Sequence, residues 1–368
     1  MKNYLLCILM IVALFSSAQN PSNDNNWVLN ESLSDEFNGT TINQEKWSST
    51  PHWGTCEDKG KKNAYRYDET PQASHFSLSN GVLTLKAIKE KCTCKDMDWD
   101  SNKYKYYNAY YSEGALFSKG NRFKYGYFEI RCKFPDAYKF KGINPSFWLY
   151  GKTSGDTNSW NEIDIYEFNG YRNIHTCNAY YRDYIMVANN EYPDNDNRWI
   201  LRSGDNKTYY DFYVDFYKFH TFACEWTPEY INFYYDDKLV RRTESKYCGK
   251  LESMIMYVTM GIEDGKFGDS ENNVSKNTKW PYSYQIDYIR YYNMKMDCKT
   301  VVNKSNFDFN KFNYAVKKSI TLKNSSVPQN GKFTLRATDF IELQGEFTVP
   351  FGSELTIIPT PEFEHYKN

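Results

Sequence analysis

Short runs with strand character recur along almost the whole chain, and they are separated by Gly, Asn and Asp residues. Apolar and polar residues alternate in several of them, which is typical of a strand with one buried face. Helical periodicity is scarce. Many short strands separated by turn residues indicate a β-sandwich or a jelly roll. The runs are Val82–Ala87, Tyr125–Phe134, Phe147–Tyr150, Glu162–Phe168, Phe219–Trp226, Tyr230–Tyr235 and Tyr284–Tyr292.

The first residues have the composition of a secretory signal peptide. Lys2 is followed by the apolar run Leu5–Phe15 and by small residues that end at Ala18. A positive start, a short apolar core and a small-residue cleavage site direct export. The apolar run is too short to span a bilayer. We therefore predict cleavage after Ala18 and a secreted, periplasmic or cell-surface protein without a membrane span.

The composition of the chain changes near Cys298. We expect a signal peptide at 1–18 and a large β domain at 19–297. The stretch 298–318 is polar and rich in Asn and Lys, which favours a linker. Residues 319–368 contain strand-like runs separated by Gly, so we predict a small β-rich extension there. A segment of about 50 residues has only a marginal core, so the extension is expected to dock on the large domain.

Charge and aromatic content bear on the partners of the chain. The net charge is −1, which does not favour binding to nucleic acid or to an anionic membrane. Aromatic residues make up 18% of the chain. They suit pleated sheets, but aromatic rings also stack on the apolar faces of sugars while Tyr hydroxyls reach sugar hydroxyls. Composition alone leaves both interpretations open.

Three carboxylic acids lie close together in the segment Ser159–Gly170, which reads SWNEIDIYEFNG. In a regular strand Glu162 and Asp164 share a face, whereas Glu167 is out of phase by one residue. A β-bulge near positions 165–166 would bring all three onto the same face. Retaining glycosidases need two neighbouring carboxyl groups, one as nucleophile and one as acid/base. An acidic strand edge that deters aggregation is the structural alternative.

The segment Glu162–Glu167 resembles the Glu-x-Asp-x-x-Glu motif of glycoside hydrolase family 16. The resemblance covers about residues 27–297 in family order. It implies retention of anomeric configuration and an all-β fold, a concave β-jelly-roll sandwich, to which the small C-terminal β-rich extension is added. The other similar segments are Ser34–Gly39, Lys124–Arg131, Pro145–Leu149, Phe219–Pro228, Phe233–Asp237 and Ile286–Tyr292.

The resemblance also implies roles for single residues. By position in the motif, Glu162 is the nucleophile, Asp164 the assisting acid and Glu167 the acid/base. Trp160 matches a tryptophan that lines the sugar site beside the scissile bond, and strand alternation places it on the same face as Glu162. A place in the core is the alternative for Trp160. We interpret Trp148 as a core residue.

Two positions depart from the glucan-cleaving pattern of the family. Asn144 precedes Pro145 where many members have Trp, and His175 is followed four residues later by Ala179 instead of a second His. We expect Asn144, His175 and Asn178 to bind substrate, with simple strand packing as the alternative for His175. Because these positions lie where substrate is recognised, they leave the choice between glucan and galactan open.

The sequence therefore predicts a secreted, endo-acting, retaining β-glycanase that hydrolyses β-1,3- or mixed-linkage glucan by double displacement. The same chemistry on an algal galactan of the agar, porphyran or carrageenan type is the first alternative. A carbohydrate-binding jelly roll without catalysis and a transglycosylase are the others. We expect a monomer that binds a polysaccharide substrate.

Metal and disulfide sites complete the predictions. Two-carboxylate catalysis needs no cofactor, but the resemblance implies a structural calcium ion held by Glu36 and Asp287, with ordinary surface acids as the alternative. An even number of cysteines after an export signal permits disulfides. The bridge candidates are Cys56, Cys92, Cys94 and Cys248, and the expected buried thiols are Cys132, Cys177 and Cys224.

Aromatic residues in 98–111 are expected to line outer sugar subsites or to pack over their own loop.

Overall fold

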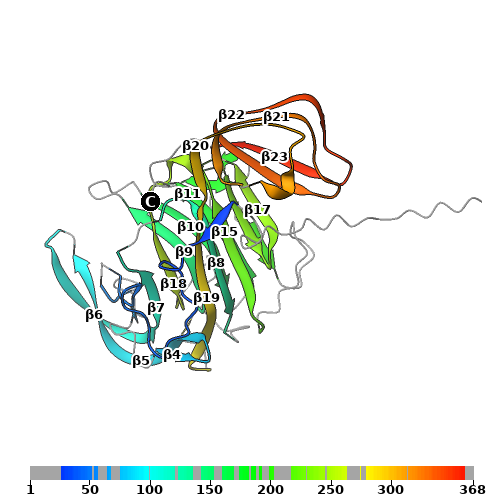
Figure 1. Cartoon of the computed structure of the whole chain (residues 1–368). Helices are drawn as coiled ribbons and strands as arrows, with labels where there is room; N and C mark the ends of the chain where they lie inside the picture. Colours follow the sequence, from blue (N-terminus) through cyan, green and yellow to red (C-terminus); the bar gives the residue numbers. More distant parts are fainter. Residues whose placement is uncertain are drawn as a thin grey trace, which may run out of the picture.

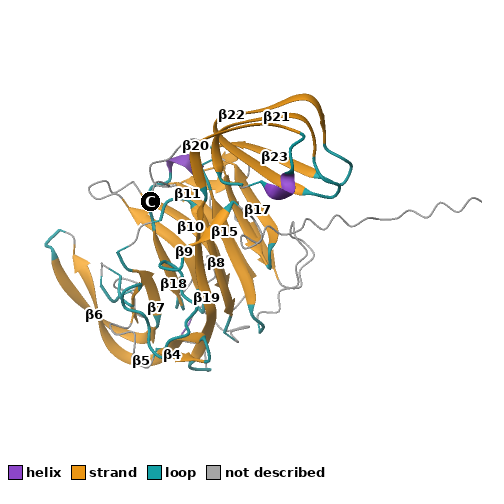
Figure 2. Ribbon diagram, viewed as in Figure 1, coloured by secondary structure: helices purple, strands orange, loops and turns teal. Residues whose placement is uncertain are grey.

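Strands make up nearly all the regular structure of the chain in the computed structural model (Figure 1 and Figure 2). The predicted signal peptide at 1–18 lies outside the described residues. Within the described part of the chain, no helix is both long and apolar enough to cross a membrane. The described residues are 26–51, 54–56, 64–67, 75–98, 100–120, 123–135, 142–152, 160–169, 174–181, 184–187, 190–192, 199–202, 217–228, 230–244, 247–262, 274, 279–312 and 314–360.

The first of two large sheets contains ten of the described strands. They are β1 (Trp27–Leu29), β3 (Ala64–Tyr67), β4 (Phe76–Ser79), β5 (Val82–Asp98), β6 (Lys103–Glu113), β8 (Gly126–Lys133), β15 (His220–Trp226), β16 (Tyr230–Tyr235), β17 (Lys238–Glu244) and β19 (Tyr282–Met294). The order is β17-β16-β15-β8-β19-β5-β6-β3, with β1 beside β19 and β4 beside β5. All pairs are antiparallel except β3 with β6.

The second large sheet contains nine of the described strands. They are β2 (Trp47–Ser48), β7 (Ala115–Ser118), β9 (Ser146–Lys152), β10 (Trp160–Asn169), β11 (Ile174–Tyr181), β12 (Tyr184–Val187), β13 (Asn190–Tyr192), β14 (Trp199–Arg202) and β18 (Ile255–Thr259). The order is β13-β12-β11-β10-β9-β18-β7-β2, with β14 beside β11. The predicted motif therefore lies on a central strand, β10.

The two sheets enclose one large apolar core. Phe128 and Ile130 from the first sheet belong to the same buried cluster as Leu149 and Ile163 from the second. Each large apolar side chain that is fully buried contributes about 1.5–3 kcal/mol to stability. The thiols predicted to be buried lie in this cluster, namely Cys132, Cys177 and Cys224.

One disulfide joins two of the predicted bridge candidates, Cys56 and Cys94. Cys248 was also a candidate, but it is buried in the inter-sheet core within the short helix η1 (Cys248–Lys250). Its carbonyl oxygen accepts a hydrogen bond from Trp226 Nε1 at 3.2 Å. The polar sequence around Cys248 suggested a loop cysteine, but η1 turns this residue into the core.

A third sheet follows the two large ones and is drawn in orange to red in Figure 1. Its four parallel strands are β20 (Met296–Ser305), β21 (Val316–Ser326), β22 (Lys332–Thr348) and β23 (Glu354–Pro359). Register partners recur every 18 to 22 residues along the chain, as in Asp297, Lys317, Ala337 and Pro359. The chain therefore coils through successive stacked turns.

The stretch 298–318 is structured, although its composition suggested a linker. It contains most of β20, the short helix η4 (Phe309–Lys311) and the start of β21. An edge strand needs few apolar residues, because one face and one edge meet solvent. In β20, Val302 alone is buried, and it joins the apolar core of the extension with Ile320 and Leu322.

The extension packs on the outer face of the first large sheet. Ala223, Tyr234 and Tyr292 lie on this face, and they form a buried cluster with Met294 and Val316. Their sequence neighbours on β15 and β16 point into the inter-sheet core instead. The extension therefore covers the side of the sandwich that faces away from β10.

A buried ion pair lies beside this cluster. Arg336 of β22 donates from Nη2 to Tyr230 Oη at 2.7 Å, and the same nitrogen lies 3.4 Å from Glu225 Oε1. The side chains of Arg336 and Glu225 are each 3% exposed. The hydroxyls of Tyr230 and Tyr234 also donate to Glu225, at 2.8 Å each. The junction thus holds a carboxylate that depends on the extension for its cation.

Candidate active site

The strand β10 contains the predicted bulge. Its register with β11 shifts between Asp164 and Glu167, and its register with β9 shifts between Asp164 and Tyr166. Ile163, Ile165, Tyr166 and Phe168 all belong to the inter-sheet core. Two consecutive residues, at positions 165 and 166, therefore face inward, and the alternation resumes one step later. The bulge leaves the carboxylates of positions 162, 164 and 167 on the opposite face.

Neighbouring strands place aromatic and amide side chains beside these carboxylates. Glu162 lies opposite Tyr150 of β9 and Tyr180 of β11 in the register. Burial raises the pKa of the Tyr150 hydroxyl, and the negative charge of Glu162 raises it further. The hydroxyl therefore stays protonated near Glu162. Glu162 and Glu167 are partly exposed, whereas Asp164 is only 2% exposed.

A row of aromatic side chains runs from the carboxylates across the second sheet. Asp164 is paired with Trp148, Trp148 with Tyr257, and Tyr257 with Phe117. The rings of Trp148 and Tyr257 stack at 4.4 Å between centroids. Trp148 was predicted to be a core residue. It lies outside the inter-sheet cluster and, together with Tyr150, is partly buried against a smaller cluster that contains Phe117 and Tyr257. Phe147 and Leu149 of β9 face inward, so alternation along the strand could have placed Trp148 and Tyr150 on the opposite face, with the carboxylates.

Trp160 lies at the start of β10, two residues before Glu162. It is partly exposed and packs on Tyr180 of β11, with 5.8 Å between ring centroids and 37° between the ring planes. Trp160 is outside the inter-sheet cluster. The structure therefore brings Trp160 to the carboxylate face, as alternation predicted.

Asn178 is fully buried and lies opposite Asp164 in the register of β10 with β11. A cation from the other sheet reaches it, because Arg241 Nη1 of β17 lies 3.4 Å from Asn178 Oδ1 and also donates to the carbonyl oxygen of Cys177. Burial lowers the pKa of Arg241, and the negative charge of Asp164 acts in the opposite direction. Sequence reasoning missed Arg241, since no local pattern links β17 to the motif.

The other two predicted substrate-binding residues have different outcomes. Asn144 is 3% exposed, and its N–H donates to the carbonyl oxygen of Gly261 at 2.8 Å. Gly261 has φ +64°, and a Cβ there would lie 1.9 Å from the Asn144 carbonyl oxygen. This close backbone contact with Gly261 therefore holds Asn144 in place just before the start of β9. The backbone of His175 pairs with Phe168 in β11, but its side chain lies outside the described residues.

The side chains predicted to hold calcium do not fit a calcium site. Both carboxylate oxygens of Glu36 accept hydrogen bonds from Arg290, at 2.7 and 2.9 Å. The carboxylate of Asp287 forms an ion pair with Arg131. A divalent cation prefers several oxygen ligands without a competing guanidinium. Within the described ranges, no group of three or more His, Cys, Asp or Glu side chains could hold a metal ion.

Comparisons with known proteins agree with this arrangement. A family model described as Beta-porphyranase A-D, GH16 domain, matches residues 27–294. The endo-1,3-1,4-beta-glycanase ExsH of Rhizobium meliloti is 26% identical over 282 residues, which cover 73% of this chain and 53% of that protein. Beta-porphyranase B of Phocaeicola plebeius is 28% identical over 239 residues, which cover 58% of this chain and 66% of that protein.

A solved structure bears on the fold. The catalytic domain of an endo-1,3-beta-glucanase (laminarinase) from Thermotoga petrophila RKU-1 matches with a TM-score of 0.53 at 21% identity, over 73% of this chain and 98% of that domain. Together with the two-layer sheet order, this similarity confirms the predicted jelly-roll sandwich. The chain spans about half the length of the first curated relatives that it matches.

Proposed function

The chain belongs to glycoside hydrolase family 16, and from this membership we propose that it is an endo-acting, retaining β-glycanase. The observation that carries the proposal is the bulge in β10, since it leaves Glu162, Asp164 and Glu167 on one face of a central strand. Crowding like charges on one face destabilises a strand. Chemistry that needs two carboxyl groups gives a reason to retain such an arrangement.

In the proposed reaction, Glu162 acts as the nucleophile and Glu167 as the acid/base. The Glu162 carboxylate attacks the anomeric carbon while Glu167 protonates the departing glycosidic oxygen. A covalent glycosyl-enzyme forms, and the leaving chain departs with its new hydroxyl. Glu167 then removes a proton from water, which displaces Glu162 from the same anomeric carbon. Two inversions at one carbon retain its configuration.

Two neighbours support the nucleophile in this proposal. The Tyr150 hydroxyl lies beside Glu162 and remains protonated, so it can donate to the carboxylate or to a sugar oxygen. Asp164 shares the carboxylate face and is almost fully buried. A second carboxyl group in that position shares a proton with its neighbours and limits the build-up of negative charge. Asp164 is therefore proposed as the assisting acid.

Aromatic residues at the carboxylate face support sugar binding. Trp160, Tyr150 and Trp148 are partly exposed there, and large flat rings stack on the apolar faces of pyranoses. The two tryptophans extend the aromatic surface to opposite sides of β10, because Trp160 packs toward β11 and Trp148 toward β18. We therefore propose that the polysaccharide crosses the strands, with sugars bound on both sides of the cleaved bond.

For the substrate, we propose a β-linked galactan of the porphyran type, with β-1,3- or mixed-linkage glucan as the second candidate. The family model that matches residues 27–294 carries the porphyranase description, which supports the galactan. Asn144, where glucan-cleaving members often have Trp, points the same way. The similarity to an endo-1,3-1,4-beta-glycanase supports the second candidate.

The test is release of reducing ends from porphyran, agarose, κ-carrageenan, laminarin and lichenan by the purified protein. The proposal expects activity on porphyran and a rapid fall in chain length, as endo-cleavage produces. Activity on laminarin or lichenan alone would move the substrate to the second candidate. Glu162→Gln should reduce turnover by at least about 10⁴-fold, since nucleophile loss removes the first step. Undiminished turnover of this variant would overturn the role of Glu162 as nucleophile. A wild-type protein that releases no reducing ends from any of these polysaccharides would leave a carbohydrate-binding protein.

We also propose that the protein is exported, on the basis of the signal-like residues 1–18. Expression of the full chain in a bacterial host tests this directly. A protein recovered outside the cytoplasm with an N-terminus at Gln19 would support export, and an intact Met1 form retained in the cytoplasm would contradict it.

A further inference from the structure

The strands β5 and β6 form a long hairpin with two different faces. One face carries Cys94 and Asp96 of β5 beside Tyr107 and Lys105 of β6, because these residues pair in the register. The next pairs, Lys95 with Tyr106 and Met97 with Tyr104, belong to the other face, since side chains alternate along a strand. In Figure 1 the end of this hairpin extends away from the two packed sheets.

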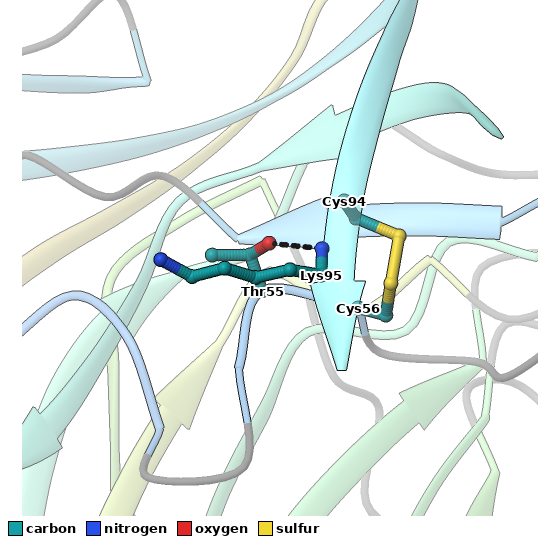
Figure 3. Close-up of a disulfide and its surroundings, with 4 residues drawn as sticks. All are labelled: Thr55, Cys56, Cys94 and Lys95. Carbon is teal, nitrogen blue, oxygen red and sulfur yellow. Dashed lines mark hydrogen bonds between the residues drawn. A yellow bond between two sulfur atoms is a disulfide. The ribbon is translucent and has the colours of Figure 1, made fainter. Parts of the chain in front are cut away.

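A short segment, residues 54–56, covers the first face (Figure 3). Cys56 is bonded to Cys94, and Thr55 Oγ1 accepts a hydrogen bond from the Lys95 N–H at 2.9 Å. The N–H groups of Thr55 and Cys56 both donate to the Lys95 carbonyl oxygen, at 2.7 and 3.1 Å. Cys94 and Asp96 are at most 3% exposed as a result. The disulfide and these hydrogen bonds fix the hairpin from one side.

The second face, which we name the tyrosine face, carries Tyr104, Tyr106, Asn108 and Tyr110. Its tyrosines are 41%, 70% and 40% exposed, in that order, and Asn108 between them is also exposed. Residues two apart on a strand are separated by about 6.6 Å. The ammonium group of Lys95 lies 5.1 Å from the centroid of the Tyr104 ring. The face therefore combines three flat rings with the Asn108 amide, which donates and accepts hydrogen bonds, and the Lys95 ammonium, which donates them.

The tyrosine face points away from the space between the sheets. Tyr107 and Ala109 lie on the covered face, and Tyr111, the next residue of that alternation, is part of the inter-sheet core. The tyrosines at 104, 106 and 110, which alternate with these residues along β6, therefore face outward. The carboxylates lie on another sheet, on β10. The tyrosine face is thus a separate surface from the candidate active site.

We propose that the tyrosine face is a second polysaccharide-binding site, which holds a strand of the same β-linked polysaccharide outside the active site. This inference rests on the proposed function for the identity of the ligand. Exposed aromatic side chains gathered on one surface mark an interaction site. Protein interfaces favour apolar centres depleted of Lys, whereas the rings here are interleaved with Asn108 and Lys95. Pyranoses present apolar faces bordered by hydroxyl groups, which suits a surface of rings with polar groups beside them.

The disulfide gives this site a fixed shape before the ligand arrives. A flexible hairpin would lose conformational entropy when its side chains are ordered by a ligand. Here Cys56–Cys94 and the hydrogen bonds to Lys95 have already ordered the backbone that carries Tyr104 and Tyr106. These contacts on the covered face therefore hold the tyrosine face in shape, although they do not themselves touch the sugar.

The experiment compares variants in a Glu162→Gln background, so that the polysaccharide is not degraded. Retention is measured by affinity electrophoresis in gels that contain porphyran or, separately, laminarin. The triple variant Tyr104→Ala/Tyr106→Ala/Tyr110→Ala is expected to bind about tenfold more weakly, because three ring contacts are removed. Tyr217→Ala is the control, since Tyr217 is 49% exposed but lies outside the hairpin. It should bind like the parent.

A triple variant retained as strongly as the parent would overturn the inference. If the triple variant aggregates, Tyr106→Ala alone replaces it, because a residue 70% exposed can be truncated without disturbing the core. It should bind severalfold more weakly. Sedimentation that shows a parent dimer and a monomeric Tyr106→Ala variant would make the face a self-association surface and also overturn the inference. A wild-type protein that releases no reducing ends would refute the proposed function, and this result is separate from the binding results of the variants.

Discussion

The buried charge pair between the extension and the first sheet gives a stability prediction that can be worked from the structure. Replacing Arg336 by Met leaves the Glu225 carboxylate 3% exposed without its cation. Breaking one side of a buried ion pair costs about 3–5 kcal/mol. The hydroxyls of Tyr230 and Tyr234 still donate to Glu225, at 2.8 Å each. We therefore expect the lower end of that range, about 3 kcal/mol.

The assay is urea-induced unfolding of the purified protein, followed by a thermal scan. A loss of about 3 kcal/mol corresponds to a fall in Tm of about 4 °C in a chain of this size. Lys332→Met is the matched control on the same strand, since the pair of Lys332 with Glu354 is 3.6 Å apart and solvent-exposed. Loss of such a surface pair costs less than about 1 kcal/mol.

A second substitution separates the lost charge pair from lost packing. Adding Glu225→Gln to Arg336→Met removes the uncompensated carboxylate, so the double variant should recover at least about 1 kcal/mol. An Arg336→Met variant no less stable than the Lys332→Met control would refute the reasoning. A double variant as unstable as Arg336→Met would assign the loss to packing instead of charge.

The remaining predictions concern single sites. Arg241→Met should lower kcat by at least about tenfold in steady-state assays, because its guanidinium holds the β11 backbone beside the carboxylates; unchanged kcat would contradict this. The Cys56→Ser/Cys94→Ser variant should lose about 4 kcal/mol in urea unfolding, since the bridge closes a separation of 38 residues; equal stability would disprove it. The hydrogen bond from Lys105 lowers the pKa of Asp98 to about 2 from 3.8, so this pair stabilises the fold above pH 3.8 and loses its effect as the pH falls toward 2. In Lys105→Met the pKa of Asp98 should return toward 3.8, as measured by carboxyl ¹³C titration. An unchanged pKa would count against the pair.

The sequence predicted those features that depend on local alternation. The spacing of Glu162, Asp164 and Glu167 required one extra residue in the strand, and the register of β10 contains that bulge. Trp160 reached the carboxylate face for the same reason. Trp148 could have been placed by the same rule, but its large apolar ring was interpreted as core.

Contacts between distant segments could not be predicted in this way. Arg241 comes from a strand of the opposite sheet, and only the packing of the two sheets brings it to Asn178. The residues 298–318 looked like a linker because a parallel edge strand needs few apolar side chains. Glu36 and Asp287 suggested calcium by resemblance, whereas Arg290 and Arg131 decide their partners in the folded chain.

The anomeric configuration of the first product tests the two-carboxylate account most directly. Endo-cleavage is followed by ¹H NMR within minutes of adding enzyme, before the new reducing ends equilibrate. The account predicts that the β anomer appears first and that the α anomer grows later by mutarotation. An α anomer at the earliest time would mean a single displacement by water, and would contradict the role of Glu162 as nucleophile.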